Sequence, residues 1–487
     1  MTRCVSTVML YLAFPAFLLL WGAGHVTAQP APGSSPEAKD MVLVGSHDLQ
    51  GRSAYQPIIQ QQDGRFIAYI GHHGGSARNP LNGQTEPNGT SIVDVTDPRQ
   101  LRYLHHIPGS AAGAGEVGGA QMVRACSGKE LPKGDPAKTY LLRTVGNQAH
   151  EILDVTDPSH PTFVSTVISG LTTTHKNWWE CDTGIAYIVA YKQDEGWRSR
   201  GVKIFDLSDP AHPRYIRAYG VVGQEPGSAG EPVPAPLHGP IRLGNRVYFG
   251  YGTSAGGILQ IVDHDKLLHG DPASPEPFAP TAQNILYAQV GRLDIAPHAG
   301  AHTTFPVLGM QIPEVAKNQP GSTADFVVLV NEAIQHECRE YRQMVFLVDI
   351  TTASKPFAVA NFQVPEASGN FCASGGRFGS HASNESFTPI YYRRLVFISY
   401  FNAGVRAVDI RDPYRPQEVA FYIPAITQKT DKRCVPLASG GEACKVAIQT
   451  NNVEVDDRGY IYIVDRANTG LHILELTGAA RAIAHFP

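Results

Sequence analysis

The chain has 487 residues, of which 43% are hydrophobic and 17% are charged, and its formal net charge is −4. This composition is typical of a globular protein, and the 48 glycines and 36 prolines favour many short strands joined by turns over long helices. The weakly acidic balance and the lack of any basic run predict that nucleic acid is not a partner.

Residues 1–28 have the pattern of an export signal. Arg3 precedes the apolar stretch VMLYLAFPAFLLLWGAG, and the small-residue sequence VTA ends at Ala28. We therefore expect cleavage after Ala28, and the alternative is an uncleaved membrane anchor. No later stretch is apolar enough to span a bilayer, so we expect a periplasmic or secreted protein without a membrane span. Residues 29–54 are expected to form a flexible lead-in.

A short phrase returns along the rest of the chain. It is written TSIVDVTDP at 90–98, HEILDVTDP at 150–158, VKIFDLSDP at 202–210 and VRAVDIRDP at 405–413. Each copy joins an apolar, β-branched run to an acidic residue and an Asp-Pro turn, which is typical of a strand followed by a tight turn. The acidic residues that align the copies are Asp94, Asp154, Asp206, Asp263, Asp349, Asp409 and Glu475.

Two further candidate strands precede each phrase, and one short strand follows it. A repeat of more than about forty residues built from β-rich phrases is typical of propeller blades. The predicted fold is therefore all-β: a seven-bladed β-propeller of four-stranded antiparallel blades over residues 55–487. A ring that closes on itself has no obligatory partner chain, so a monomer is expected.

The repeated phrases resemble a known family, the LVIVD-repeat propellers, which are bacterial and archaeal exported proteins. The residues that carry the resemblance are SIVDVTDP, EILDVTDP, KIFDLSDP and AGVRAVDIRDP, the last followed by RPQEVAFY. The resemblance spans nearly the whole mature chain and implies the fold, but it does not indicate an activity. Blades four and five depart from the pattern, because QIVDHDKLLHGDP loses the tight turn and the fifth repeat carries the insertion LGMQIPEVAKNQPGST.

Six of the seven cysteines lie after the predicted signal, and an even number in an exported protein predicts disulfides. Cys434 and Cys444 flank one short loop and form the most direct pair. The position of the others in the repeats favours the set Cys126–Cys181, Cys338–Cys372 and Cys434–Cys444. Other connectivities and buried free thiols are the alternatives.

Four histidines occupy the same stage of successive repeats, at the start of the innermost strand of blades three to six: His175, His238, His302 and His381. Equivalent positions on innermost strands converge on the axis of a closed ring. We therefore expect four imidazoles at one mouth of the channel, where they suit a divalent transition metal such as iron, copper, zinc or manganese. The alternative is that they only pack and hydrogen-bond. The polar residues expected at this level in the other blades are Gln60, Gln121 and Asn452.

Residues that end the second strand of each blade are expected around the same mouth. Glu332 follows an apolar strand and is the predicted general base, and Arg466 and Lys192 are predicted to bind or protonate a substrate. The favoured interpretation is a metal-dependent oxidoreductase, lyase or hydrolase that takes a small polar or aromatic molecule into the channel. The alternative is a non-catalytic scaffold of the cell envelope that binds a ligand or a protein and has structural histidines.

Overall fold

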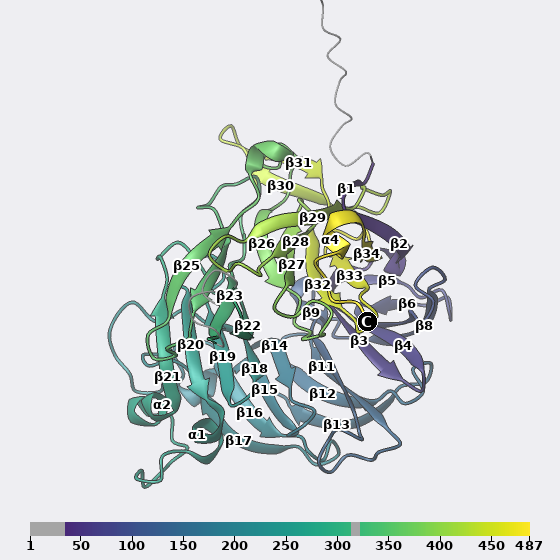
Figure 1. Cartoon of the computed structure of the whole chain (residues 1–487). Coiled ribbons are helices and arrows are strands. Elements are labelled where there is room, and N and C mark those ends of the chain that lie inside the picture. The colour runs from purple at the N-terminus through teal and green to yellow at the C-terminus, as the bar shows by residue number, and fades with distance from the viewer. Residues whose placement is uncertain (1–34, 313–321) are drawn as a thin grey trace, which may run out of the picture. The chain divides into compact units, whose positions relative to one another are not determined.

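The computed structural model describes residues 35–312 and 322–487, so the predicted signal peptide at 1–28 lies outside the described residues. The described chain forms a ring of four-stranded antiparallel sheets, one after another in sequence order (Figure 1). Their innermost strands contact one another in order, and the innermost strand of the last blade contacts that of the first. The prediction of a seven-bladed β-propeller is confirmed.

The first four blades follow the chain without interruption. Blade one contains β3 (Ala54–Gln62), β4 (Arg65–Gly74), β7 (Gly89–Asp94) and β8 (Arg102–Pro108), and β9 (Gly115–Ala120) also pairs with β4. Blade two contains β10 (Val123–Ser127), β11 (Thr139–Val145), β12 (Ala149–Asp154) and β13 (Thr162–Ile168). Blade three contains β14 (Thr173–Trp179), β15 (Ile185–Tyr191), β16 (Gly201–Asp206) and β17 (Arg214–Tyr219). Blade four contains β18 (Leu237–Leu243), β19 (Arg246–Tyr251), β20 (Ile258–Asp263) and β21 (Gln289–Asp294).

Blades six and seven each include one strand from the beginning of the described chain, whereas blade five does not. Blade five contains β22 (Thr303–Met310), β23 (Ala324–Val330), β24 (Val345–Asp349) and β25 (Phe357–Phe362). Blade six contains β26 (Phe378–Ser383), β27 (Leu395–Phe401), β28 (Val405–Asp409) and β29 (Gln417–Ile423), with β1 (Glu37–Lys39) at its outer edge. Blade seven contains β32 (Thr450–Val455), β33 (Ile461–Asp465), β34 (Leu471–Leu476) and β2 (Met41–His47).

Small elements decorate the ring. Two hairpins stand outside the blades, β5 (Ser76–Arg78) with β6 (Thr85–Pro87) and β30 (Lys432–Pro436) with β31 (Glu442–Val446). The described helices are α1 (His264–His269), α2 (Ala282–Ala288), α4 (Gly478–Arg481) and the single-turn 3₁₀ segments Leu49–Gly51, Gln193–Glu195 and Glu366–Ser368.

The repeated aspartates shape the turn that follows the third strand of a blade. The carboxylate of Asp94 accepts the backbone N–H two residues further on, and Asp154 and Asp206 do the same in the next two blades. Asp263 instead caps the first turn of α1, which explains why blade four lacks the tight turn. The short phrase is repeated because each copy makes the same strand-to-turn transition.

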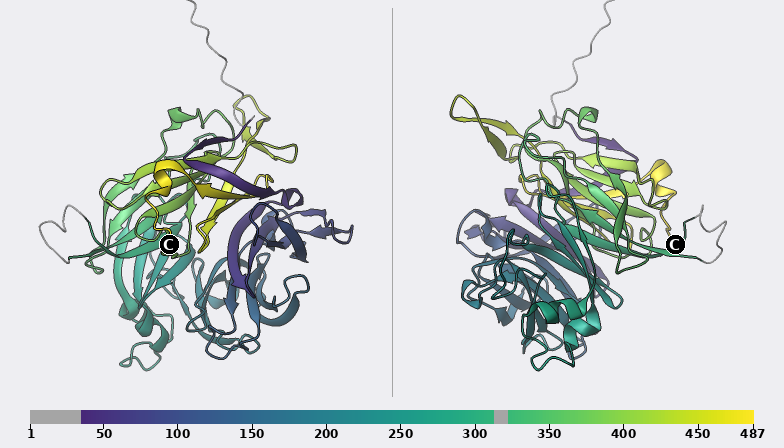
Figure 2. Two further views of the ribbon diagram at one scale, coloured as in Figure 1. Left: turned by 45° about the vertical axis from the view of Figure 1, so that its right-hand side comes forward. Right: turned by 90° about the vertical axis from the view of Figure 1, so that its left-hand side faces the viewer.

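Closure of the ring depends on β2, which is the outermost strand of blade seven. It pairs antiparallel with β34, from Met41 opposite Leu476 to His47 opposite Leu471. The purple β2 lies beside the yellow β34 in Figures 1 and 2. The expectation of a flexible lead-in over residues 29–54 is therefore wrong for this segment. Strand β2 carries no copy of the repeated phrase, so the repeat could not indicate it.

Apolar side chains fill the space between neighbouring blades. Leu142 and Ile152 of blade two, for example, pack with Ala186 and Ile188 of blade three in one buried cluster. Three disulfides add covalent links, and they confirm the favoured pairing: Cys126–Cys181, Cys338–Cys372 and Cys434–Cys444. The first connects β10 to the segment after β14, so it links adjacent blades.

The first prediction concerns the contact of β2 with blade one. A Cβ atom at Gly45 would lie 2.0 Å from the carbonyl oxygen of Pro98, which belongs to the Asp-Pro turn of blade one. We expect Gly45→Val to lower the free energy of unfolding by about 1–3 kcal/mol, because β2 must move away from Pro98. Urea unfolding at neutral pH measures this. Ser46→Val, on an exposed position of the same strand, is the control and should change little. Equal midpoints for the two variants would contradict the proposed contact.

Candidate metal centre

One residue near the start of each innermost strand contributes to a closed ring of buried side chains around the channel. The seven members, in blade order, are Tyr55, Gln121, His175, His238, His302, His381 and Asn451. The expected convergence of the four histidines is therefore present. Gln121 is at the expected level, whereas Asn451 replaces the expected Asn452 and Tyr55 replaces Gln60.

Irregular strand pairing places these side chains. The register between the first and second strand shifts around His175 in blade three, around His238 in blade four and around His381 in blade six. A bulge of this kind leaves residues outside the regular ladder and redirects their side chains. His302 immediately precedes β22, and its backbone N–H donates to Val330. The local backbone thus aims each imidazole away from the blade and toward its neighbours.

The histidines form a continuous row across four blades. Nε2 of His175 is 2.7 Å from Nε2 of His238, and the ring centroids of His238 and His302 are 3.3 Å apart. The ring of His381 follows, 4.5 Å from that of His302. Ligand atoms of His175, His238 and His302 lie within 4.8 Å of one another, and so do those of His302, Glu332 and His381. Both groups share His302.

The hydrogen bonds of Nδ1 set the orientation of the rings. Nδ1 of His238 donates to the carbonyl oxygen of His302 at 2.7 Å, and Nδ1 of His381 donates to the carbonyl oxygen of Asn451. In both rings Nε2 therefore carries a lone pair, which is the arrangement that second-shell partners impose on metal-binding histidines. Nε2 of His302 is buried and has no hydrogen-bond partner among the described residues. These features fit a metal ligand set.

Burial keeps the imidazoles neutral. It lowers the pKa of His175 to about 3, against the opposing effect of Glu116. The pKa values of His238, His302 and His381 lie well below the ordinary value, first because of burial. The next cause is the neighbouring histidines for His238 and His302, and Arg466 for His381. Neutral imidazole is the form that binds metal ions, so the four rings are in the required state at neutral pH.

Glu332, the predicted general base, lies beside the histidines just after β23. Its Oε2 is 3.5 Å from Nε2 of His302, and its Oε1 is 3.6 Å from Nε2 of His381. Nη1 of Arg377 donates to Oε1 at 2.9 Å. Burial raises the pKa of Glu332 to about 7, although Arg377 and Arg466 act in the opposite direction. The carboxyl group can therefore exist in either protonation state near neutral pH.

The two predicted basic residues have different surroundings. Nη2 of Arg466 donates to Nε2 of His73 at 2.8 Å and lies 3.9 Å from the carboxylate of Glu116, so Arg466 belongs to the mouth of the channel. Lys192 pairs with Asp194 at 3.5 Å. Within the described ranges no contact joins Lys192 to the histidines, so the structure does not bring it to the site.

Three residues of the site had not been singled out from the sequence. The hydroxyl of Tyr55 is 3.0 Å from Nε2 of His175, and Oε2 of Glu116 is 3.8 Å from its Nδ1. Arg377 holds Glu332 as described above. Glu116 and Arg377 lie in stretches that the repeated phrase does not align, which is why the repeat could not identify them.

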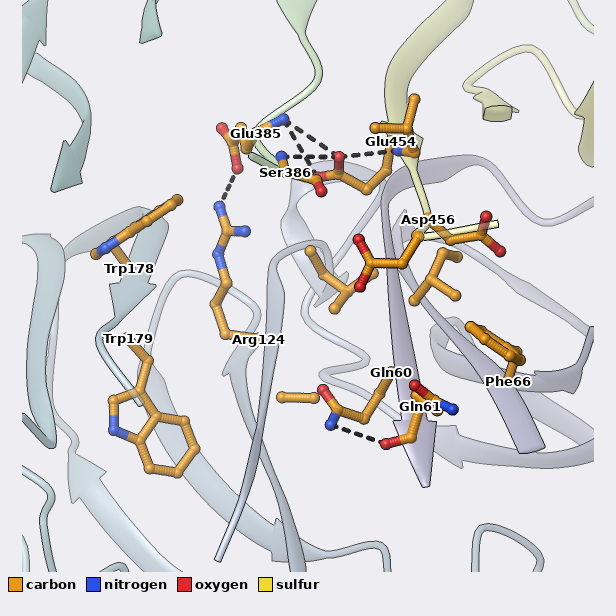
Figure 3. A pocket seen from close by; sticks show the side chains of 15 residues that line it. Gln60, Gln61, Phe66, Arg124, Trp178, Trp179, Glu385, Ser386, Glu454 and Asp456 are labelled. Carbon is orange, nitrogen blue, oxygen red and sulfur yellow. Dashed lines mark hydrogen bonds and ion pairs between the residues drawn. The ribbon is translucent and has the colours of Figure 1, made fainter. Parts of the chain in front are cut away.

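A second cluster of buried charges lies at the opposite end of the innermost strands, around a cavity of about 230 Å³. Arg124 and Lys176 both bind the carboxylate of Glu385 there, the latter at 2.6 Å. Glu454 accepts the backbone N–H of Ser386 at 3.0 Å, and Figure 3 shows the two carboxylates facing the cavity from neighbouring segments. The four charged residues come from blades two, three, six and seven, so the cluster connects blades across the channel.

The two carboxylates of this cluster have opposite pKa shifts. Burial would raise the pKa of Glu385, but Arg124 and Lys176 outweigh it and lower the pKa to about 2. Glu454 forms no ion pair in the described part of the chain. Burial, together with the charge of Glu385, raises its pKa to about 7, although Arg124 acts in the opposite direction. Only one of the two acids is therefore firmly ionised at neutral pH.

Comparison with known proteins supports the fold and leaves the activity open. A model of the LVIVD repeat matches residues 146–168, which include β12 and β13. The crystal structure of Chaetomium thermophilum Raptor is similar, with a TM-score of 0.50 and 10% identity over 90% of this chain and 29% of Raptor. The β-propeller domain of Myceliophteria thermophila Cps50 (Swd1) has a TM-score of 0.44 and 10% identity, over 86% of this chain and 98% of that domain. At this identity the likeness concerns the fold alone.

The search of curated proteins found no match to the sequence. The chain spans less than a third of the length of Raptor, and nothing about Raptor's activity is transferred. Among the described residues, no helix has the length and apolar character that crossing a bilayer requires.

The second prediction concerns the pH dependence of stability. Because the pKa of Glu454 is raised to about 7, the folded protein holds a proton there that the unfolded chain releases near its ordinary pKa. The resulting stability is present at acid pH and is lost as the pH rises through about 7. Glu454→Gln removes this titration, so relative to the wild type it should gain about 1–3 kcal/mol between pH 5 and pH 8.

Urea unfolding at the two pH values measures this difference. Glu37→Gln, at an exposed position of β1, is the control and should follow the wild type at both. Parallel behaviour of Glu454→Gln and the wild type would show that Glu454 is ionised throughout.

Proposed function

We propose that this LVIVD-repeat β-propeller is a metal-dependent enzyme whose channel histidines bind one divalent transition metal ion. The observation that carries the proposal is the convergence of four buried, neutral imidazoles from four successive blades. Iron, copper, zinc and manganese all accept imidazole ligands together with a carboxylate. The substrate is a small polar or aromatic molecule that reaches the ion through the mouth of the channel.

The hydrogen-bonding state of the rings supports binding of an ion. Gln121 donates to Nδ1 of His175, so Nε2 of His175 carries the proton that points to Nε2 of His238. For Nε2 of His175 to bind an ion as neutral imidazole, this proton would have to move to Nδ1. The amide oxygen of Gln121, which is buried without a partner in the described chain, could accept it there after a flip of the amide group. Nε2 of His302 completes the group and has no other partner in the described chain. Glu332 is positioned to approach the ion from the side of His302 and His381.

The surrounding side chains have distinct parts in the proposed chemistry. A bound metal ion would polarise a substrate oxygen or activate a water molecule. Glu332, held by Arg377, is positioned to take a proton from the substrate or the water. The hydroxyl of Tyr55 is the nearest neutral donor, since it lies 3.0 Å from Nε2 of His175. Burial of all these groups excludes bulk water, which strengthens their electrostatic interactions.

The proposed location is the periplasm or the outside of the cell. The predicted signal at residues 1–28 and the three disulfides support an oxidising compartment. Strand β2 of the same chain completes the last blade, and this supports the proposal of a monomer.

The third prediction concerns metal content. Protein purified without a tag should contain about one transition metal ion per chain, measured by inductively coupled plasma mass spectrometry. The double variant His238→Ala/His302→Ala should lose the metal and should remain folded by circular dichroism. The control double variant His160→Ala/His212→Ala removes two exposed histidines from surface turns and should retain the metal.

Two results would contradict the proposal. A metal-free wild type that cannot be loaded with any of the four metals would favour the non-catalytic scaffold. Equal metal content in the two double variants would place the ion elsewhere on the chain.

A further inference from the structure

A cavity of about 350 Å³ opens at the mouth of the channel, next to the histidines. Arg377 and His73 are part of its wall, and they also contact the site: Arg377 binds Glu332, and the ring of His73 packs against Tyr55 with centroids 5.1 Å apart. Arg377 and His73 therefore connect the cavity to the proposed metal centre, because each contacts a residue of the site as well. The volume suits a small organic molecule rather than a polymer.

The wall of this cavity carries an excess of positive charge. Three guanidinium groups, those of Arg377, Arg433 and Arg466, face a single acidic residue of the wall, Asp431. Asp431 is already paired with Arg433, since their side chains lie 2.8 Å apart, and Arg433 also donates to the carbonyl oxygen of Arg466. Arg377 and Arg466 are thus the cations that an incoming ligand would meet.

Both arginines have hydrogen-bond donors that the protein does not use. Arg377 bonds to Glu332 and to the carbonyl oxygen of Ala333 through Nη1, and its Nε and Nη2 have no hydrogen-bond partner among the described residues. Arg466 uses Nη2 for His73, and its Nη1 is buried without a partner in the same part of the chain. A guanidinium donor is costly to bury without a partner, so an acceptor is expected next to Nη1 of Arg466. The unused donors of Arg377, whose side chain is partly exposed, can bind the same acceptor.

Internal acids do not satisfy these donors. Glu116 is 3.9 Å from Arg466, beyond hydrogen-bond distance, and its side chain is half exposed at the mouth. A further buried nitrogen in the wall, Nδ1 of His336, also has no partner among the described residues. The unused groups of Arg377 and Arg466 are donors, and two planar guanidinium groups match the geometry of a planar oxyanion.

We propose that the cavity binds the carboxylate of a small monoanionic substrate through Arg377 and Arg466 and presents the rest of the molecule to the histidines. This inference rests on the proposed function and names the class of substrate. A monoanion is favoured over a dianion such as phosphate because Glu332 and Glu116 already offset part of the positive charge. The carboxylate would replace water at the unused donors without a covalent step.

The fourth prediction tests this proposal on metal-free protein. Chelator-treated wild type is titrated in low salt with benzoate, and with benzamide as the uncharged probe of the same shape, by isothermal titration calorimetry. Benzoate should bind at least about tenfold more tightly than benzamide, because charge-assisted hydrogen bonds form only with the anion. Arg377→Gln and Arg466→Gln should each weaken benzoate binding by about tenfold or more. Arg214→Gln, at an exposed surface pair with Asp206, is the control and should not.

The outcomes separate this proposal from that of the metal centre. Equal binding of benzoate and benzamide, or wild-type affinity in folded Arg377→Gln and Arg466→Gln, overturns the carboxylate site. Phosphate that binds more tightly than benzoate also overturns it. Because no metal is present in the titration, failure here with normal metal content in the untreated protein leaves the metal centre standing. Benzoate binding in a protein that takes up no metal overturns only the metal centre.

Discussion

The antiparallel pairing of β2 with β34 closes the ring of blades. It completes blade seven with a strand from the beginning of the described chain, and so it fixes the last blade against the first. Without that closure, β34 would expose the edge of its sheet. The innermost strands of the first and last blades, β3 and β32, also contact each other, and the two contacts together keep the histidines of blades three to six around one centre.

The closed ring makes it possible to bury polar groups in the channel. Three of the buried groups find partners on other blades: His238 on the backbone of blade five, His381 on that of blade seven, and Glu385 on the cations of blades two and three. Such pairing is what allows charges and imidazoles to remain away from water at tolerable cost. The chemistry of the channel and the association of the blades therefore rely on the same contacts.

The sequence predicted the number and kind of blades because the Asp phrase marks one turn in each repeat. It also predicted the four histidines, since they share one stage of that repeat. Prediction from the sequence failed for features that lie outside the repeat. The strand β2 carries no phrase, and Glu116 and Arg377 come from irregular segments. Tyr55 and His175 occupy equivalent positions, because each directly follows the residue at which the strand register shifts, Ala54 or Thr174. A tyrosine and a histidine are not recognised as copies of one repeat position in a sequence. Asn451 and Asn452 both lie within a register shift of blade seven, so the sequence does not show which of them faces the channel axis.

The separation of β2 and β34 along the chain has a consequence for biosynthesis. The ribosome makes β2 near the start of the protein and β34 more than four hundred residues later, as their positions show. Strand β2 must therefore remain without its partner until almost the whole polypeptide has been made, and blade seven cannot be completed earlier. Contacts between such distant segments form slowly. Completion of the ring is therefore a late step that requires two distant segments of the chain to meet.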